Sequence, residues 1–224
     1  MNIPRNNPHV DTVLFDLDGT LADTAPDLAH ALNEVRREQG RRALPYELIR
    51  PVVSHGANAL IHLGFECEPG EAGFAAIKRR LLDIYEANIA VRTRLFPGME
   101  EVLREIESRG KRWGVVTNKP SWLTEPLMRG LELSQRAACI VSGDTAEQPK
   151  PHPAPLHFAC NLTGSRAEHC IYVGDAQRDI EAGRNAGMTT LAALFGYLSE
   201  TDNPQEWGAD GLIEEPGDIL DWID

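Results

Sequence analysis

Short apolar segments alternate with amphipathic segments along most of the chain, and this alternation constrains the fold more than any other feature of the sequence. Helical patterns separate strand-like segments at residues 13–15, 112–117, 138–142, 169–173 and 189–194. Strands that alternate with helices favour a parallel sheet with right-handed crossovers. The sequence therefore predicts the α/β class, as a Rossmann-like doubly wound parallel sheet between two helical layers (an α/β/α core). The tail, residues 195–224, is rich in turn residues and has one short helix or strand pattern around 218–223.

One long interval breaks this alternation, because no strand pattern occurs between about residues 24 and 90. Thr24 is placed to cap a helix whose apolar stripe includes Leu28, Leu32 and Val35, with Gly40 as its stop. Short helices and a longer one at 72–88 follow. Because this helical block comes directly after the first strand, we expect an inserted α-helical cap at residues 23–94, with residues 1–22 and 95–224 forming the core.

The charge of the chain limits its partners. Asp and Glu number 34 against 22 Lys and Arg, and the formal net charge of −12 disfavours binding to nucleic acid or an anionic membrane. No apolar run approaches membrane-spanning length, and residues 1–9 lack the apolar core of a signal peptide. The four cysteines show no close metal-type pairing, which favours free thiols in a reducing compartment. We expect a cytoplasmic monomer or homodimer with no nucleic-acid or membrane partner.

Two carboxylates follow the first strand with one residue between them. Asp16 and Asp18, then Gly19 and Thr20, leave that strand at its carboxyl end, where open α/β sheets bind their ligands. One carboxylate could attack an electrophile while the other moves a proton, and both could hold a hard cation. The alternative is a strand that ends in an Asp-Gly turn with solvated acids.

Other polar residues occupy equivalent positions further along. Thr117 and Asn118 end the strand at 112–117, although a turn or helix cap before Ser121 would also explain them. Lys150 lies between two prolines directly before a helical segment, a stiff setting for a lysine that neutralises phosphate charge.

Asp175 ends the strand at 169–173, and Asp179 lies one helical turn further on. A solvated helix-capping acid would explain either residue alone. Oxygen ligands gathered at one sheet edge suit Mg²⁺, which keeps several waters and uses few carboxylates. We therefore expect Mg²⁺ as the cofactor.

Taken in order, these motifs resemble those of a known family. Asp16-x-Asp18-Gly19-Thr20, Thr117-Asn118, Lys150-Pro151 and Gly174-Asp175-x-x-x-Asp179 are similar to the four motifs of the haloacid dehalogenase-like hydrolases, phosphatase branch, over residues 12 to about 195. The inserted helical block resembles the cap of the subgroup that contains phosphoglycolate phosphatases and β-phosphoglucomutases. Residues 15–28 look like the phosphoglycolate phosphatases, whereas 113–120 and 202–210 resemble the related N-acetylmuramic acid 6-phosphate phosphatases.

The resemblance implies a phosphate-monoester hydrolase that acts on a small phosphorylated metabolite. Asp16 would attack phosphorus and form an aspartyl-phosphate, and Asp18 would serve as general acid and then general base. Mg²⁺ would be held by Asp16, the backbone carbonyl of Asp18, and Asp175.

The remaining motif residues would bind phosphate or support the site. Thr117, Asn118 and Lys150 would stabilise the phosphoryl charge, and Asp179 would orient metal-bound water or Lys150. The sequence departs from its relatives at Ala176 and Gln177, where a hydroxyl or another acid is common, so the outer shell of the metal would rest more on Asp179.

The cap would close over the site and select the substrate. Arg50 and His55 flank a break at Pro51–Gly56 and are the candidate substrate contacts, although they also fit ordinary cap surface. Two other functions remain open: a sugar phosphomutase, which uses the same core, and a non-enzymatic phospho-acceptor module, which has no cap and does not need Asp18. Dehalogenase chemistry is disfavoured, because a halide leaving group requires neither Asp18 nor Mg²⁺.

Overall fold

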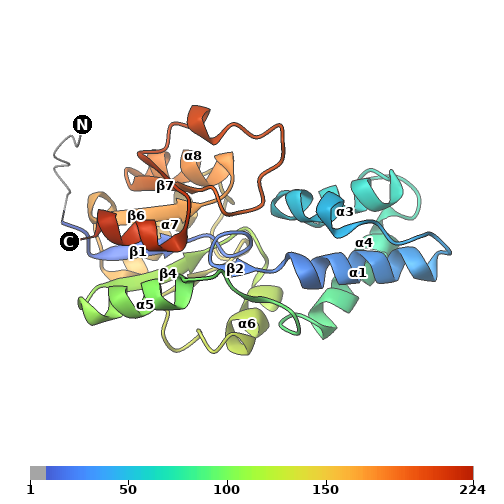
Figure 1. Cartoon of the computed structure of the whole chain (residues 1–224), viewed down its shortest axis with the longest axis horizontal. Coiled ribbons are helices and arrows are strands. Elements are labelled where there is room, and N and C mark those ends of the chain that lie inside the picture. Colours follow the sequence, from blue (N-terminus) through green and yellow to red (C-terminus); the bar gives the residue numbers. More distant parts are fainter. Residues whose placement is uncertain (1–8, 224) are drawn as a thin grey trace.

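A computed structural model describes residues 9–223, and its centre is a six-stranded parallel sheet (Figure 1). The strand order β5-β4-β1-β6-β7-β8 is that of a doubly wound fold and confirms the predicted class. The strands are β1 (Thr12–Phe15), β4 (Arg112–Val116), β5 (Ile140–Val141), β6 (Cys170–Gly174), β7 (Thr189–Ala193) and β8 (Gly211–Ile213). The sequence did not predict β8, which lies in the turn-rich tail.

Strand β1 lies in the middle of the sheet, and its four residues are buried. Phe15 pairs with Val115 of β4 on one side and with Val173 of β6 on the other. Since the three strands are parallel and end at the same level, the residues that follow them meet at one edge of the sheet. This register brings Asp16, Thr117 and Asp175 together.

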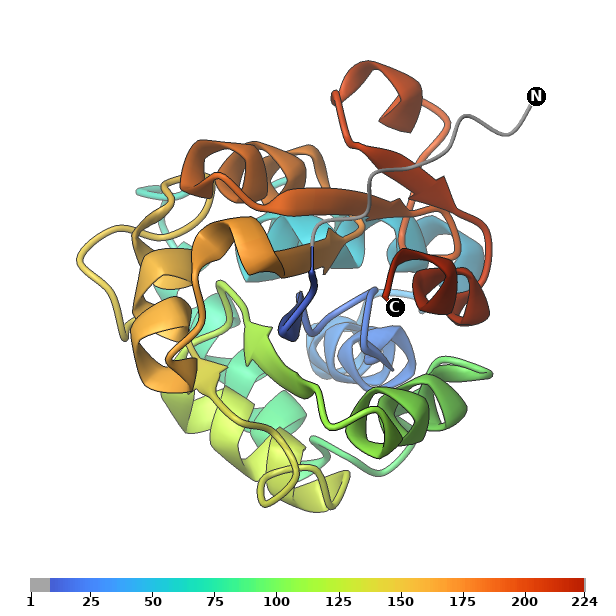
Figure 2. The same cartoon turned by 90° about the vertical axis from the view of Figure 1, so that its left-hand side faces the viewer.

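Helices cover both faces of the sheet (Figure 2). Successive side chains of a strand point to opposite faces, so Val13 and Phe15 belong to one core cluster and Leu14 to another. Helix α5 and the 3-10 helix η4 pack together on the first face, whereas α7 and α8 pack together on the second. The core helices are α5 (Met99–Ser108), α6 (Ser121–Gly130), α7 (Ala154–Thr163), α8 (Gln177–Ala186), η2 (Ala167–His169), η3 (Pro204–Glu206) and η4 (Pro216–Trp222).

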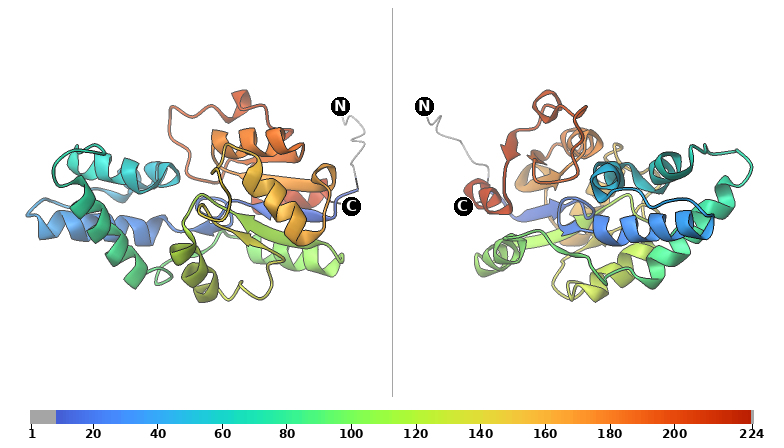
Figure 3. Two further views of the ribbon diagram at one scale, coloured as in Figure 1. Left: turned by 180° about the vertical axis from the view of Figure 1, so that it is seen from behind. Right: turned by 45° about the vertical axis from the view of Figure 1, so that its right-hand side comes forward.

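The helical insertion lies beyond the carboxyl edge of the sheet, where α1, α3 and α4 pack against one another (Figure 3). Its helices are α1 (Ala25–Glu38), α2 (Tyr46–Ile49), η1 (Arg50–His55), α3 (Gly56–Phe65) and α4 (Phe74–Ala87). Two short strands, β2 (Ala22–Asp23) and β3 (Arg94–Leu95), pair antiparallel where the chain enters and leaves this region. The domain boundaries at residues 23 and 94 stay a prediction.

Two contacts fix the start of this region. The buried Asp27 carboxylate in α1 accepts hydrogen bonds from the backbone N–H groups of Arg92 and Thr93 and from the Thr93 hydroxyl. Thr24 occupies the N-cap position of α1, as predicted, but its side chain makes no cap hydrogen bond and donates instead to Asp18. Within residues 9–223, no helix is both long and apolar enough to cross a membrane.

Candidate active site

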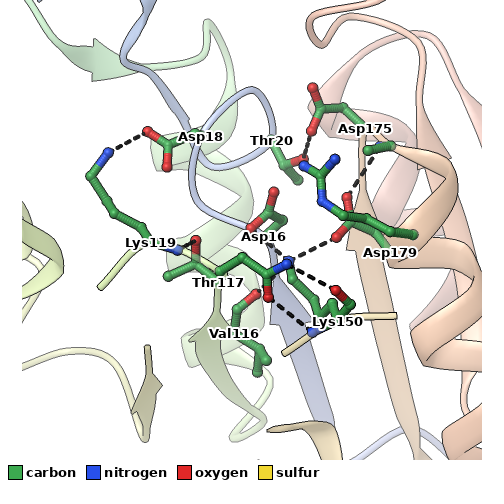
Figure 4. Close-up of polar contacts among 12 residues, drawn as sticks. Asp16, Asp18, Thr20, Val116, Thr117, Lys119, Lys150, Asp175 and Asp179 are labelled. Carbon is green, nitrogen blue, oxygen red and sulfur yellow. Dashed lines mark hydrogen bonds and ion pairs between the residues drawn. The ribbon is translucent and has the colours of Figure 1, made fainter. Parts of the chain in front are cut away.

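Figure 4 shows the predicted motif residues gathered at the carboxyl edge of the sheet. Asp16 follows β1, Thr117 follows β4 and Asp175 follows β6. Lys150 precedes α7, and Asp179 lies in the first turn of α8. Residues that are far apart in the sequence therefore share one site because parallel strands end at the same edge.

The Lys150 ammonium is the centre of a buried polar network. Its Nζ donates to Asp16 Oδ1 at 2.8 Å, to the Tyr172 hydroxyl at 2.7 Å and to the Val116 carbonyl at 3.0 Å, and it pairs with Asp179 Oδ1 at 2.7 Å. Burial lowers the pKa of Lys150, but the carboxylates of Asp16 and Asp179 outweigh it and raise that pKa overall. Lys150 therefore carries a fixed positive charge directly beside Asp16.

Asp175 is also buried, and both of its carboxylate oxygens accept hydrogen bonds. Its Oδ1 accepts a hydrogen bond from the Thr20 hydroxyl at 3.2 Å, and its Oδ2 accepts from the Ser54 hydroxyl at 2.7 Å and the Tyr197 backbone N–H at 2.9 Å. Burial, followed by the nearby carboxylates, raises the pKa of Asp175 to about 7. The site thus concentrates more negative charge than its own donors neutralise.

The acidic cluster has the composition of a site for a small hard cation. Carboxylate oxygens of Asp16, Asp175 and Asp179 lie within 4.8 Å of one another, and all three residues are buried. The turn after Asp18 approaches closely: a Cβ on Gly19 would lie 2.2 Å from Asp175 Oδ2, and the φ of Gly19 is +87°. Three buried carboxylates this close together fit a small hard cation such as Mg²⁺.

The second acid of the first motif, Asp18, has separate partners. Its Oδ1 accepts hydrogen bonds from the Thr24 hydroxyl at 2.5 Å and from Lys119 Nζ at 2.8 Å. The Lys119 ammonium lies 4.6 Å from the ring centroid of Tyr85. Burial lowers the pKa of Lys119, but the Asp18 carboxylate raises it overall, so this lysine is charged.

The Thr117-Asn118 motif holds its own loop and the Lys150 loop. Thr117 Oγ1 accepts a hydrogen bond from the Lys119 backbone N–H at 3.1 Å. The Asn118 side chain donates to the Lys150 carbonyl and accepts from the Lys150 backbone N–H, both at 2.9 Å. We therefore expect Asn118 to contact phosphate through its backbone N–H; the phosphate-binding role of both residues stays a prediction.

A cavity of about 450 Å³ lies between the core motifs and the inserted helices. Asp16, Asp18, Thr117, Asn118 and Lys119 line it from the core side. Leucines and other apolar side chains form much of the opposite wall. Polar and charged residues of the insertion that line the cavity are Ser54, His55, Asn58, Lys78 and Tyr85, and Arg178 of the core helix α8 lines it as well.

The two predicted cap contacts lie in different places. His55 lines the cavity, whereas Arg50 is not among the described residues that do so. The Arg50 guanidinium donates to the carbonyls of Phe195 and Gly196, at 3.2 and 3.0 Å, and lies 4.9 Å from the Tyr197 ring centroid. This geometry ties the insertion to the core; substrate contact by either residue stays a prediction.

Residues of the site that the sequence did not indicate include Ser54, Tyr85, Lys119 and Arg178. Lys119 directly follows Asn118 and Arg178 directly precedes Asp179, so their positions next to motif residues were a usable signal. Ser54 and Tyr85 belong to the inserted helices and carry no motif. Arg178 donates to the Ser54 carbonyl at 2.6 Å, so these two residues hold the insertion against the acidic cluster.

The comparison with known families decides the assignment. The sequence model of the family described as haloacid dehalogenase-like hydrolase matches residues 13–193, which include all four motifs and the insertion. The chain belongs to the haloacid dehalogenase-like hydrolases. It is therefore an enzyme of this hydrolase family, as the sequence resemblance predicted.

Relatives that match this chain over nearly its whole length are named as phosphatases. The chain is 42% identical over 212 residues to an N-acetylmuramic acid 6-phosphate phosphatase of Pseudomonas putida, covering 95% of each chain. It is 43% identical over 216 residues to a phosphoglycolate phosphatase of Xanthomonas campestris, covering 96% of this chain and 95% of the relative. A crystal structure of a predicted phosphoglycolate phosphatase from Haemophilus somnus superposes with a TM-score of 0.84 at 28% identity, covering 95% and 97% of the two chains.

Proposed function

We propose that this enzyme is a Mg²⁺-dependent phosphatase that hydrolyses a small phosphate monoester through an aspartyl-phosphate, with 2-phosphoglycolate as the first candidate substrate. The observation that carries the proposal is the placement of Asp16. Its carboxylate lines the cavity and accepts a hydrogen bond from the buried Lys150, while Asp18 lines the same cavity two residues away. A nucleophile and a proton carrier thus face one bound substrate.

In the first step, a carboxylate oxygen of Asp16 attacks phosphorus, and the bond between phosphorus and the alcohol oxygen breaks. Protonated Asp18 gives its proton to the departing alkoxide. Lys150 and the residues at 117–118 stabilise charge on the phosphoryl oxygens, the largest contribution to catalysis of phosphoryl transfer.

In the second step, Asp18 takes a proton from water as the water oxygen attacks the aspartyl-phosphate. The bond between phosphorus and Asp16 breaks, which releases inorganic phosphate and restores both carboxyl groups to their starting states. The Thr24 hydroxyl and Lys119 hold Asp18 in place for both proton transfers.

Asp16, Asp175 and the backbone carbonyl of Asp18 would hold Mg²⁺. The bound ion supplies positive charge that offsets repulsion between the carboxylate and the phosphate. Asp179 contributes through Lys150, with which it forms an ion pair at 2.7 Å. The insertion covers the cavity, excludes bulk water and selects the alcohol portion of the substrate.

Phosphate release in the presence of Mg²⁺ and after exhaustive chelation tests the proposal. We expect turnover of at least one phosphate monoester to require Mg²⁺, and the nearly isosteric variant Asp16→Asn to be inactive while remaining folded. Full turnover without metal, or substantial turnover by Asp16→Asn, would rule the mechanism out.

N-acetylmuramic acid 6-phosphate is the second candidate substrate, because the Pseudomonas putida relative is 42% identical over nearly the whole chain. A panel of 2-phosphoglycolate, N-acetylmuramic acid 6-phosphate and common sugar phosphates distinguishes these activities. Product analysis after incubation with a hexose phosphate distinguishes hydrolysis from phosphomutase activity.

A further inference from the structure

The proposed phosphatase mechanism assigns no role to the α4 side chains that line the cavity. Helix α4 presents Lys78, Leu82 and Tyr85 to the cavity, a spacing that places all three on one face of the helix. Tyr85 is fully buried, and its hydroxyl makes no hydrogen bond of ordinary geometry within residues 9–223, although it interacts with the nearby Lys119 ammonium. Buried hydroxyl groups normally have a partner, so this oxygen is available to a ligand.

Three residues that line the same cavity are cationic, Lys78, Lys119 and Arg178, and they lie beside the acids Asp16 and Asp18. The chain has lysines at 78, 111, 119 and 150; two of them line the cavity, and Lys150 lies beneath it beside Asp16. In a protein with a net charge of −12, this placement favours an anionic ligand. Lys150 serves the phosphoryl group, which leaves the charge of Lys119 for another part of the substrate.

Lys119 is positioned to bind two groups at once. Its side chain is 7% exposed, and its Nζ donates to Asp18 Oδ1 at 2.8 Å beside the Tyr85 ring. An ammonium group has three N–H donors, so the contact with Asp18 does not exhaust it. The leaving oxygen of the substrate must lie within hydrogen-bond reach of Asp18, so the group attached to that oxygen starts close to Lys119.

The other walls limit what this group can be. Leu28, Leu60, Leu82 and Leu123 also line the cavity, so part of its wall is apolar and lies beside the polar and charged lining residues. A charged group in such surroundings interacts more strongly with a partner charge than it would in water.

We propose that the Lys119 ammonium and the Tyr85 hydroxyl form a subsite for a carboxylate carried by the alcohol portion of the substrate. The subsite rests on the proposed phosphatase function and adds to it a class of substrate: phosphate monoesters that also bear a carboxylate. The carboxylate could be attached next to the leaving oxygen, as in 2-phosphoglycolate, or further away on a sugar ring, as in N-acetylmuramic acid 6-phosphate.

Two matched substrate pairs test the proposal and distinguish these sources. The first pair is 2-phosphoglycolate and 2-hydroxyethyl phosphate; the second is N-acetylmuramic acid 6-phosphate and N-acetylglucosamine 6-phosphate, which lacks the lactyl acid. We expect kcat/KM to favour the acid in at least one pair by about 10- to 100-fold, the range of a hydrogen bond to a charged group. The pair that shows the preference identifies where the carboxylate is attached.

Variants then assign the preference to residues. Lys119→Met should bring the acid-to-neutral ratio of kcat/KM close to one, and Tyr85→Phe, which removes a single oxygen, should reduce it several-fold. Lys111→Met is the matched control, because Lys111 donates to the Val10 carbonyl away from the cavity. If Lys119 acted only by positioning Asp18, Lys119→Met would lower kcat/KM equally for the acid and its neutral partner.

Several results overturn the subsite without affecting the phosphatase assignment. The first is equal kcat/KM for the acid and its neutral partner in both pairs. The second is an acid-to-neutral ratio that is unchanged in Lys119→Met and Tyr85→Phe, or that is lost in Lys78→Met instead. The third is an enzyme that hydrolyses p-nitrophenyl phosphate but none of the four esters. Absence of turnover with every phosphate ester, p-nitrophenyl phosphate included, would instead overturn the proposed function.

Discussion

Replacing Lys150 with methionine keeps most of the length of the side chain and removes its charge. The ammonium contacts Asp16 at 2.8 Å and Asp179 at 2.7 Å, and the three side chains are 1%, 5% and 0% exposed. In Lys150→Met, two buried carboxylates therefore lose their ion-pair partner. Removing one member of a buried ion pair costs about 3–5 kcal/mol, so we expect a loss of that size in the free energy of unfolding.

The loss should be measured on metal-free protein, by urea unfolding and by the melting temperature. In a chain of this length, 1 kcal/mol corresponds to about 2–4 °C, so the melting temperature should fall by roughly 6–20 °C. Without Lys150, burial raises the pKa values of the two carboxyl groups in the folded state, and stability then decreases as pH rises. The deficit relative to wild type should therefore be smaller at pH 5 than at pH 8.

Asp179→Asn in the Lys150→Met background provides the control, since it removes one of the two unpaired charges. The double variant should recover part of the lost stability, and the two effects should be non-additive. A deficit below about 1 kcal/mol that is independent of pH and unrelieved by Asp179→Asn would refute the assignment of Lys150 as the counter-charge of this cluster.

Three further predictions concern Asp18, Asp175 and the turn at Gly19. Asp18→Asn should slow hydrolysis of an alkyl phosphate by about 10²–10⁴-fold, because its alkoxide needs a proton to leave. The first step with an aryl phosphate should be slowed much less, so rapid mixing should show a burst of phenol. Equal loss of rate for the two substrates, without a burst, would exclude proton transfer by Asp18. The pKa of Asp175 is raised to about 7, so the metal-free fold should lose stability as pH rises from about 4 to 7. Mg²⁺ should then raise the melting temperature more at pH 8 than at pH 5, and an equal rise would contradict this. Gly19→Ala would place a Cβ 2.2 Å from Asp175 Oδ2, so it should lower both stability and kcat, and wild-type values would show that the turn can move away.

The sheet and its flanking helices were predictable because each has a strong local pattern. Helix α8 was predicted at residues 177–186 and occupies Gln177–Ala186. The strands β2 and β3, of two residues each, are too short to show a period, and they pair across residues that are far apart in the sequence. Strand β8 lies among turn residues and is defined by its pairing with β7 rather than by its own composition.

The motif residues were predictable as a set, but their individual contacts were not. The sequence placed Asn118 at a strand end, but it did not indicate that its side chain binds the Lys150 backbone. Thr24 has the residue type and position of a helix cap, and its hydroxyl bonds Asp18 instead. Tyr85 looked like one more apolar residue of a helix stripe, because an unpartnered hydroxyl is visible only when its neighbours are known.

The pairing of β2 with β3 has a consequence for how the family can vary. Ala22 lies opposite Leu95 and Asp23 opposite Arg94, so residues 24–93 leave the core and return to it at neighbouring positions. A loop whose ends are already joined adds little closure entropy when it is lengthened or shortened, because that cost grows only with the logarithm of loop length. The chain between the two strands could therefore be exchanged for another of different length at little cost in closure entropy, with the loss of contacts such as the hydrogen bond from Ser54 to Asp175. Such an exchange would change the cavity wall that faces Asp16 and Asp18 while both acids stay in the core.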